Sequence, residues 1–242
     1  MINLLLPSRA KTPDISASAS HDLALLLNMV AYGERIATEA ASWQAKASND
    51  PRSKRFFRAQ SRHERFHATL FQGGAAWLSK APLPPEHRIR ALSDYQQRLD
   101  SAMRRENFLE VLVGQQLVLE GIGEVVLSSL EKGMSQHDIG FGKLRSLILR
   151  QEHAHHSYGI RLLEDELTAG STDPEMLTSL AMPYLELADI LLDDCAPLLG
   201  SIEVDASDYR EELWSQLPSW LEKTEREQQD PGPIDWTGRR SA

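Results

Sequence analysis

Residues 64–67 read Glu-Arg-Phe-His and residues 152–155 read Glu-His-Ala-His, so a carboxylate followed three positions later by an imidazole occurs twice. On a helix, positions i and i+3 share a face, so each pair can close on a single metal ion. Glu34 precedes the first pair by 30 residues, and Glu120 precedes the second by 32. Four helices that supply Glu, Glu-x-x-His, Glu and Glu-x-x-His predict a bundle whose core holds two metal ions bridged by carboxylates.

The composition around these motifs indicates an all-α protein. The 242 residues can bury a substantial core in one domain, and 41% hydrophobic with 25% charged residues is typical of a soluble globular chain. The chain is rich in Leu, Ala, Glu and Arg, which lose little on entering a helix, and it shows no strand-and-turn pattern. We predict an N-terminal arm over residues 1–20, a four-helix core over 21–168, accessory helices over 169–230 and a tail over 231–242.

Caps and prolines predict the boundaries of the first two helices. Ser20 is a candidate cap for a helix over about residues 21–48. Asp50 is the candidate cap of the second helix, with Pro51 at its first position. This second helix is expected to weaken at residues 73–74, which are both glycine, and to end before the prolines that begin at residue 82.

The later helices are predicted in the same way. A helical region over about residues 86–132 is too long for a single packed helix, and we expect it to bend near Glu106. The next helix covers about residues 143–168. A fifth begins at residues 173–174 and is kinked or broken at Pro183, and a sixth, over about residues 205–227, is interrupted at Pro218.

The net charge of −9 is distributed unevenly along the chain. Residues 1–110 hold 16 Lys or Arg against 11 Asp or Glu, whereas the remainder holds 10 against 24. The basic residues are densest in the second predicted helix, at Arg52, Lys54, Arg55, Arg58, Arg62 and Arg65. We interpret them as a solvated helix face that pairs with the acidic half, and the overall acidity argues against a nucleic-acid partner.

Neither a membrane nor a disulfide is expected. No stretch approaches the roughly 20 consecutive apolar residues of a membrane span, and the apolar opening, residues 1–7, is too short for a secretion signal. The single cysteine, Cys195, forbids an internal disulfide, excludes a four-cysteine iron centre and is expected to be a small buried hydrophobe. We therefore predict a cytoplasmic protein with no membrane partner.

The predicted ligand helices place their carboxylates within otherwise apolar stripes. Burying a charge there is costly unless the charge is paired or coordinated. Two divalent ions would supply four positive charges against four carboxylates, which makes a buried site nearly neutral. Mixed oxygen and imidazole ligation suits iron or manganese, and the absence of thiolates argues against a structural zinc site.

With these motifs, residues 21–168 resemble the ferritin-like di-iron carboxylate superfamily. The superfamily includes ferritins, rubrerythrins, aldehyde-deformylating oxygenases, subunits of bacterial multicomponent monooxygenases and a family of tRNA hydroxylases. The resemblance implies a ferritin-like four-helix bundle, here with additional C-terminal helices, and two bound iron ions or, alternatively, manganese. Carried over residue by residue, it makes Glu34 and Glu120 the ligands from the helices without a histidine, Glu64 and Glu152 the bridging carboxylates, and His67 and His155 the imidazole ligands.

Two of these ligands have neighbouring competitors. Glu39 could replace Glu34, and Glu124, one turn after Glu120, could replace Glu120. The glycines at residues 121 and 123 weaken the helix at this point. They predict a π-bulge, room for a substrate or close helix packing.

Other polar residues beside the motifs also need an interpretation. His63 completes His-Glu-x-x-His, the zinc-protease signature in which Glu64 would be the base, but this alternative leaves the second Glu-x-x-His pair unexplained. His63 and His156 are instead interpreted as groups bonded to the ligands or as alternative ligands. Tyr158, near His155 in the same helix, is the candidate catalytic residue, as a redox-active or hydrogen-bonding group near the metal, with packing in the core as the alternative.

The resemblance implies a non-haem di-iron oxidase or monooxygenase that uses O₂ to hydroxylate or otherwise oxidise a small organic substrate. The electrons would come from a separate reductase or ferredoxin, because no flavin, nicotinamide or iron–sulfur motif is found. The alternatives are a ferroxidase or peroxide-detoxifying protein and, ranked lower, a tRNA-modifying hydroxylase. The additional C-terminal helices argue against a ferritin cage, and the lone cysteine argues against a self-contained rubrerythrin. A homodimer is a further expectation.

Overall fold

The computed structural model describes residues 16–79, 81–85, 89–137, 142–204 and 209–221, and these contain helices but no strand. The all-α prediction is therefore confirmed. In chain order the elements are α1 (Ala17–Ala47), α2 (Pro51–Leu78), α3 (Arg90–Arg104), α4 (Phe108–Leu112), the π-helix η2 (Val113–Leu119), α5 (Glu120–Gln136), α6 (Gly142–Thr168), α7 (Pro174–Gly200) and α8 (Tyr209–Gln216).

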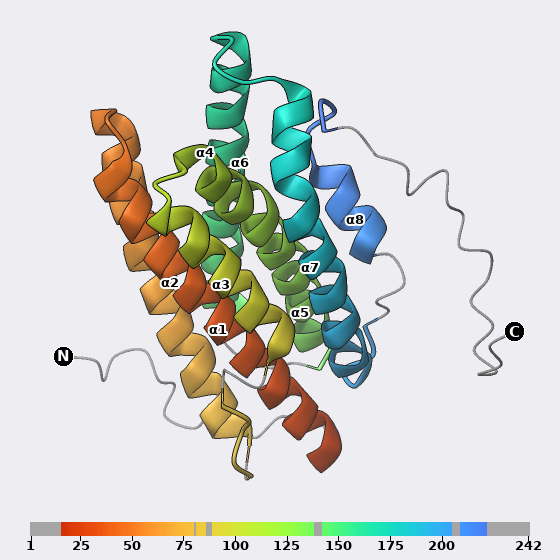
Figure 1. The fold of residues 1–242 in the computed structure, drawn as a ribbon. Coiled ribbons are helices and arrows are strands. Elements are labelled where there is room, and N and C mark those ends of the chain that lie inside the picture. Colours follow the sequence, from red (N-terminus) through yellow and green to blue (C-terminus); the bar gives the residue numbers. More distant parts are fainter. Residues whose placement is uncertain (1–15, 80, 86–88, 138–141, 205–208, 222–242) are drawn as a thin grey trace, which may run out of the picture.

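The long helices lie side by side in one bundle (Figure 1). The core consists of α1, α2, the continuous stretch α4–η2–α5, and α6; α1 and α2 form the most extensive pair. Helix α3 packs on α1 and α7, and α7 also contacts η2 and α5, while α8 covers α5 and α7. The additional helices are therefore α3 as well as the two that follow the core.

Side-chain caps fix the starts of the first two helices. Helix α1 begins four residues earlier than predicted, because Ser16 rather than Ser20 accepts a hydrogen bond at its N-terminus, from the Ala19 backbone N–H at 3.0 Å. Asp50 caps α2 as predicted, and it accepts a 2.7 Å hydrogen bond from the Ser53 backbone N–H. The glycines at residues 73–74 do not interrupt α2, which continues to Leu78.

The bend expected near Glu106 separates α3 from α4. Glu106 has a φ of 55°, in the left-handed region, and Asn107 then caps α4. The π-helix that follows covers residues 113–119 and so ends before the glycines at 121 and 123, for which a bulge was one of three interpretations. The Tyr95 hydroxyl donates a 2.6 Å hydrogen bond to the Gly114 carbonyl and so satisfies one backbone acceptor within the π-helical stretch.

The C-terminal helices differ from the prediction in detail. Helix α7 contains Pro183 and Pro197 but continues to residue 200, so of the predicted kink or break at Pro183 the break does not occur. Helix α8 ends before Pro218, where the predicted helix is interrupted, and residues 205–208 and 222–227 of that prediction lie outside the described residues. Residues 1–15 of the predicted arm and the predicted tail lie outside the described residues.

Two buried features bear on the expected compartment. The stretch Phe108–Gln136 is long and apolar enough to cross a membrane, but most of it is buried inside the bundle, as in the core helix of a soluble domain. Cys195 is buried as predicted, and burial raises the pKa of its thiol to about 12. The cytoplasmic location stays a prediction.

Candidate metal centre

The six predicted ligands lie together in the middle of the bundle and form two groups of donor atoms. Within each group, one donor atom from every member lies within 4.8 Å of the others. All six residues are buried, and Glu64 belongs to both groups. The first group contains Glu34, Glu64, His67 and Glu152, and the second contains Glu64, Glu120 and His155.

The first group surrounds one imidazole nitrogen with three carboxylates. His67 Nδ1 lies 2.9 Å from Glu152 Oε1, 3.1 Å from Glu64 Oε2 and 3.5 Å from Glu34 Oε2. An imidazole nitrogen carries at most one proton, so it cannot donate well to three oxygens at once. Four donor atoms that face a common centre are instead the arrangement expected around a cation.

The second group repeats this arrangement on the other side of Glu64. His155 Nδ1 lies 2.9 Å from Glu64 Oε1 and 3.5 Å from Glu120 Oε2. These atoms are close enough for ion pairs but are not aligned for hydrogen bonds. The buried atoms without a hydrogen-bond partner include both oxygens of Glu64, Oε2 of Glu120, Oε1 of Glu152, and Nδ1 of His67 and His155. Such atoms are costly unless a further group satisfies them, and two cations would do so.

The far nitrogens of both imidazoles are held by neighbouring side chains. His67 Nε2 lies 2.9 Å from the Gln151 amide oxygen, and His155 Nε2 lies 3.2 Å from His63 Nδ1. An amide oxygen only accepts, so His67 keeps a proton on Nε2 in this pair. Nδ1, which faces the carboxylates, is then the nitrogen that would bind a cation once its own proton is displaced.

The electrostatics of the cluster also favour cation binding. Burial raises the pKa of Glu34 and Glu120 well above the usual carboxyl value, and neighbouring carboxylates add to the effect. Burial opposes charge on Glu64 as well, but the facing imidazoles outweigh it and lower the pKa of Glu64 to about 2. Burial disfavours charged imidazoles too, yet the carboxylates raise the pKa of His67 and bring that of His155 to about 11. Four groups thus retain protons that two divalent cations would replace.

Buried glutamines surround Glu120, and their role was not predicted from the sequence. Gln60 Nε2 donates to Glu120 Oε1 at 2.8 Å, and Gln115 Nε2 donates to the same oxygen. Gln116 Nε2 donates to the Gln60 amide oxygen at 2.9 Å and to that of Gln44 at 3.1 Å. A signal was present in the sequence, because Gln60 and Gln116 each lie one helical turn before a predicted ligand within an apolar stripe.

Comparison with known proteins adds evidence for the fold. No known family model matches the chain, and no curated protein matches it in sequence. Among solved structures, it is similar to protein 19 from Synechococcus, which has aldehyde deformylating oxidase activity; the two share 18% sequence identity with a TM-score of 0.72. The similarity covers 85% of this chain and 90% of the other. The chain has a ferritin-like fold.

The ferritin-like bundle also shows where the competing residues lie. Glu39 is exposed and belongs to neither donor group, whereas Glu34 is buried among the donors. Glu124 also lies outside both groups; its carboxylate pairs with His153 at 2.9 Å and with His156 at 3.3 Å. These pairs occupy the Glu124 oxygens, so Glu34 and Glu120 remain the predicted ligands.

Two further predicted residues contribute no atom to either donor group. His63 lies outside both donor groups and contacts the ring of His155, whereas a His-Glu-x-x-His zinc site would require it as a ligand beside His67. Tyr158 stacks on Phe56 with ring centroids 3.7 Å apart, and its hydroxyl pairs with Ser53 Oγ at 2.9 Å. The catalytic role of Tyr158 stays a prediction, because these contacts do not bring its hydroxyl to a donor atom.

The donor set fits two first-row divalent ions. Oxygen donors outnumber nitrogen donors and no thiolate takes part, which suits iron or manganese better than a structural zinc ion. Glu64 would bridge the two ions, because one of its oxygens faces each imidazole, whereas Glu152, the other predicted bridge, belongs to the first group alone. Metal ligation by the six residues stays a prediction. The geometry adds to it an assignment of each residue to one of the two donor groups, or to both in the case of Glu64.

Proposed function

We propose that the chain is a di-iron, O₂-dependent oxidoreductase that oxidises a small apolar organic molecule. The supporting observation is a pocket of about 70 Å³ that reaches Glu34, Glu120 and Glu152, three of the predicted ligands. Its other lining residues are almost all apolar and come from α1, α3, η2, α5 and α7; they include Met29, Val30, Leu119, Ile122, Val126 and Leu191.

The chemistry of this pocket favours an organic substrate over iron as the species oxidised. A route for hydrated iron would be expected to carry carboxylates along its length, whereas here the carboxylates lie only at the metal centre. At about 70 Å³ this space is smaller than a complete small-molecule site, so its apolar side chains would exclude water and admit O₂ or one end of an apolar substrate beside the ligands. The ferroxidase and peroxide-detoxifying alternatives therefore rank lower.

The iron ions, when bound, would supply the redox chemistry and the open positions for O₂. The contribution of the chain is to hold both ions in a dry core and to fix the ligand directions through Gln60, Gln115, Gln151 and His63. A separate reductase or ferredoxin would donate the electrons. The oxidase activity of the similar Synechococcus protein supports the proposal at the level of reaction class.

Anaerobic loading with Fe²⁺ followed by O₂ tests the proposal. We expect about two irons per chain and, with reduced ferredoxin supplied as electron donor, O₂ consumption that increases when a medium-chain aldehyde, alcohol or alkane is added. Glu64→Ala should abolish both signals, whereas Glu39→Ala, which removes an exposed carboxylate outside the cluster, should leave them unchanged. Iron uptake without any substrate-dependent O₂ consumption or product would overturn the oxidoreductase proposal in favour of iron handling.

A further inference from the structure

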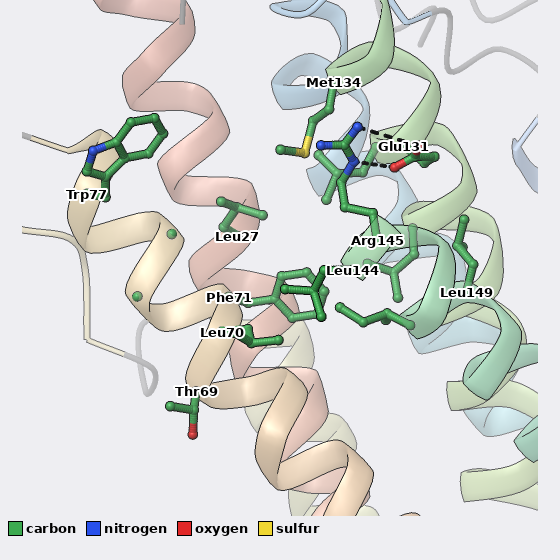
Figure 2. A pocket seen from close by; sticks show the side chains of 15 residues that line it. Leu27, Thr69, Leu70, Phe71, Trp77, Glu131, Met134, Leu144, Arg145 and Leu149 are labelled. Carbon is green, nitrogen blue, oxygen red and sulfur yellow. Dashed lines mark hydrogen bonds and ion pairs between the residues drawn. The ribbon is translucent and has the colours of Figure 1, made fainter. Parts of the chain in front are cut away.

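A second, larger pocket opens between α2 and α6, beside the metal centre (Figure 2). Its volume of about 390 Å³ falls in the range of small-molecule sites, about 300–1,000 Å³. The walls are almost entirely apolar and come from all four core helices. They include Leu27, Phe71, Leu130, Met134, Leu144 and Ile148.

This pocket is separate from the metal centre but adjacent to it. None of the six predicted ligands lines it. However, Phe71 follows His67 by one turn of α2, and Ile148 precedes Glu152 by one turn of α6. Leu127 lines both this pocket and the smaller pocket that reaches the ligands, so it separates the two spaces.

Two consecutive glycines in α2 help to create this space. A Cβ added at Gly73 would meet no atom within 4 Å, and one added at Gly74 would meet only the end of Leu27, at 3.1 Å. Trp77 stands on the same helix, across the opening from Met134 and Arg145, with 47% of its surface exposed. An apolar hollow of this size with an exposed aromatic residue at its wall is expected to have an apolar occupant.

The charged groups of this pocket lie together at one point. Arg145 on α6 forms an ion pair with Glu131 on α5, and Figure 2 shows both side chains at the edge of the pocket near Met134. Both are largely buried, with side-chain exposures of 13% and 24%. Because the two charges compensate each other, the pair offers hydrogen-bonding atoms without selecting for a charged ligand.

We propose that this pocket binds an elongated, uncharged apolar molecule with one polar head group, such as a medium-chain alcohol. The chain of the ligand lies among the leucines, Phe71 and Met134, and its head group lies at the Glu131–Arg145 pair. The site requires no metal, so a failed binding test would not contradict the proposed oxidoreductase activity, and a missing oxidoreductase activity would not contradict this site. Its occupant would lie one side chain, Leu127, away from the pocket at the metal centre.

Calorimetric titration of the full chain with 1-decanol, in the presence of a chelator, tests this site. We expect saturable binding that Gly73→Leu weakens at least tenfold, because Gly73 lines the pocket and open space surrounds its Cβ position, so a leucine there can occupy part of the cavity. Leucine is a strong helix former, so this substitution should not disrupt α2. Gln72→Leu is the matched control: Gln72 is the preceding residue, is exposed and does not line the pocket, so the affinity should not change.

Three results would overturn the proposal. The first is no binding of 1-decanol to the unmodified chain, and the second is unchanged affinity in both of two wall variants, Gly73→Leu and Leu144→Trp. The third is tighter binding of decanoate than of 1-decanol, which would assign the site to an anion held by Arg145. As a second substitution in the wall, Leu144→Trp should also weaken binding.

Discussion

Gln60 Nε2 donates a 2.8 Å hydrogen bond to Oε1 of Glu120, and both side chains are buried. Gln115 donates to the same oxygen, so Oε1 is satisfied and Oε2 is left facing His155. The glutamines thereby direct a single oxygen of Glu120 toward the second donor group. Gln60 acts on the predicted metal through Glu120 and is a positioning residue.

Replacing Gln60 by Leu should weaken metal binding without removing a ligand. The loss of a group that orients a ligand typically costs about 10–100-fold in metal affinity, and we expect Mn²⁺ affinity, measured by electron paramagnetic resonance, to fall in that range. Gln72→Leu on the exposed face of the same helix is the control. Equal Mn²⁺ affinity in the Gln60→Leu and unmodified proteins would show that the hydrogen bond does not position Glu120.

Glu64 and Glu120 should differ in how many ions they retain. Glu64 contributes to both donor groups, so Glu64→Ala should reduce the metal content from about two ions per chain to nearly none. Glu120 contributes to the second group alone, so Glu120→Ala should leave about one ion, held by the first group. Metal content by mass spectrometry after dialysis measures this. Equal losses in both variants would contradict the bridging role of Glu64.

Gly159 lies where α6 packs against η2, and its replacement by Ala should destabilise the fold. A Cβ at this position would lie 2.2 Å from Gln116 Cβ and 3.2 Å from Gln116 Cα. Overpacking of this kind costs about 1–3 kcal/mol, which urea denaturation of the metal-free protein would detect. By contrast, Gly33→Ala in α1 meets no atom within 4 Å and should stabilise by up to about 1 kcal/mol. Similar free energies of unfolding for both variants would argue against this close packing.

Metal affinity should increase with pH. The pKa values of His67, Glu34 and Glu120 are raised, and that of His155 is about 11, so these groups hold protons that the cations must displace. Raising the pH removes competing protons, so we expect tighter Mn²⁺ binding at about pH 8 than at about pH 6, with proton release into a weakly buffered solution. Binding without proton release would indicate that these groups are already deprotonated.

The sequence alone was sufficient to predict the all-α fold and the helices that carry the cluster. Caps such as Asp50 and periodic apolar stripes depend on interactions within a few residues, so they can be read locally. The two Glu-x-x-His pairs could also be recognised, because a helix brings positions i and i+3 together wherever it packs. The choice of Glu34 over Glu39 followed from register, and the structure buries the first and exposes the second.

Only the tertiary structure showed which side chains from different helices meet. The contact of Gln60 with Glu120 joins residues 60 positions apart, and the contact of His63 with His155 joins residues 92 apart. Neither contact follows from local periodicity. The π-helix arises where Tyr95 bonds the Gly114 carbonyl, so its position could not be read from the glycines after it. The two pockets could not be predicted from the sequence either. Each is a space left between several helices, so no sequence pattern within a single helix indicates it.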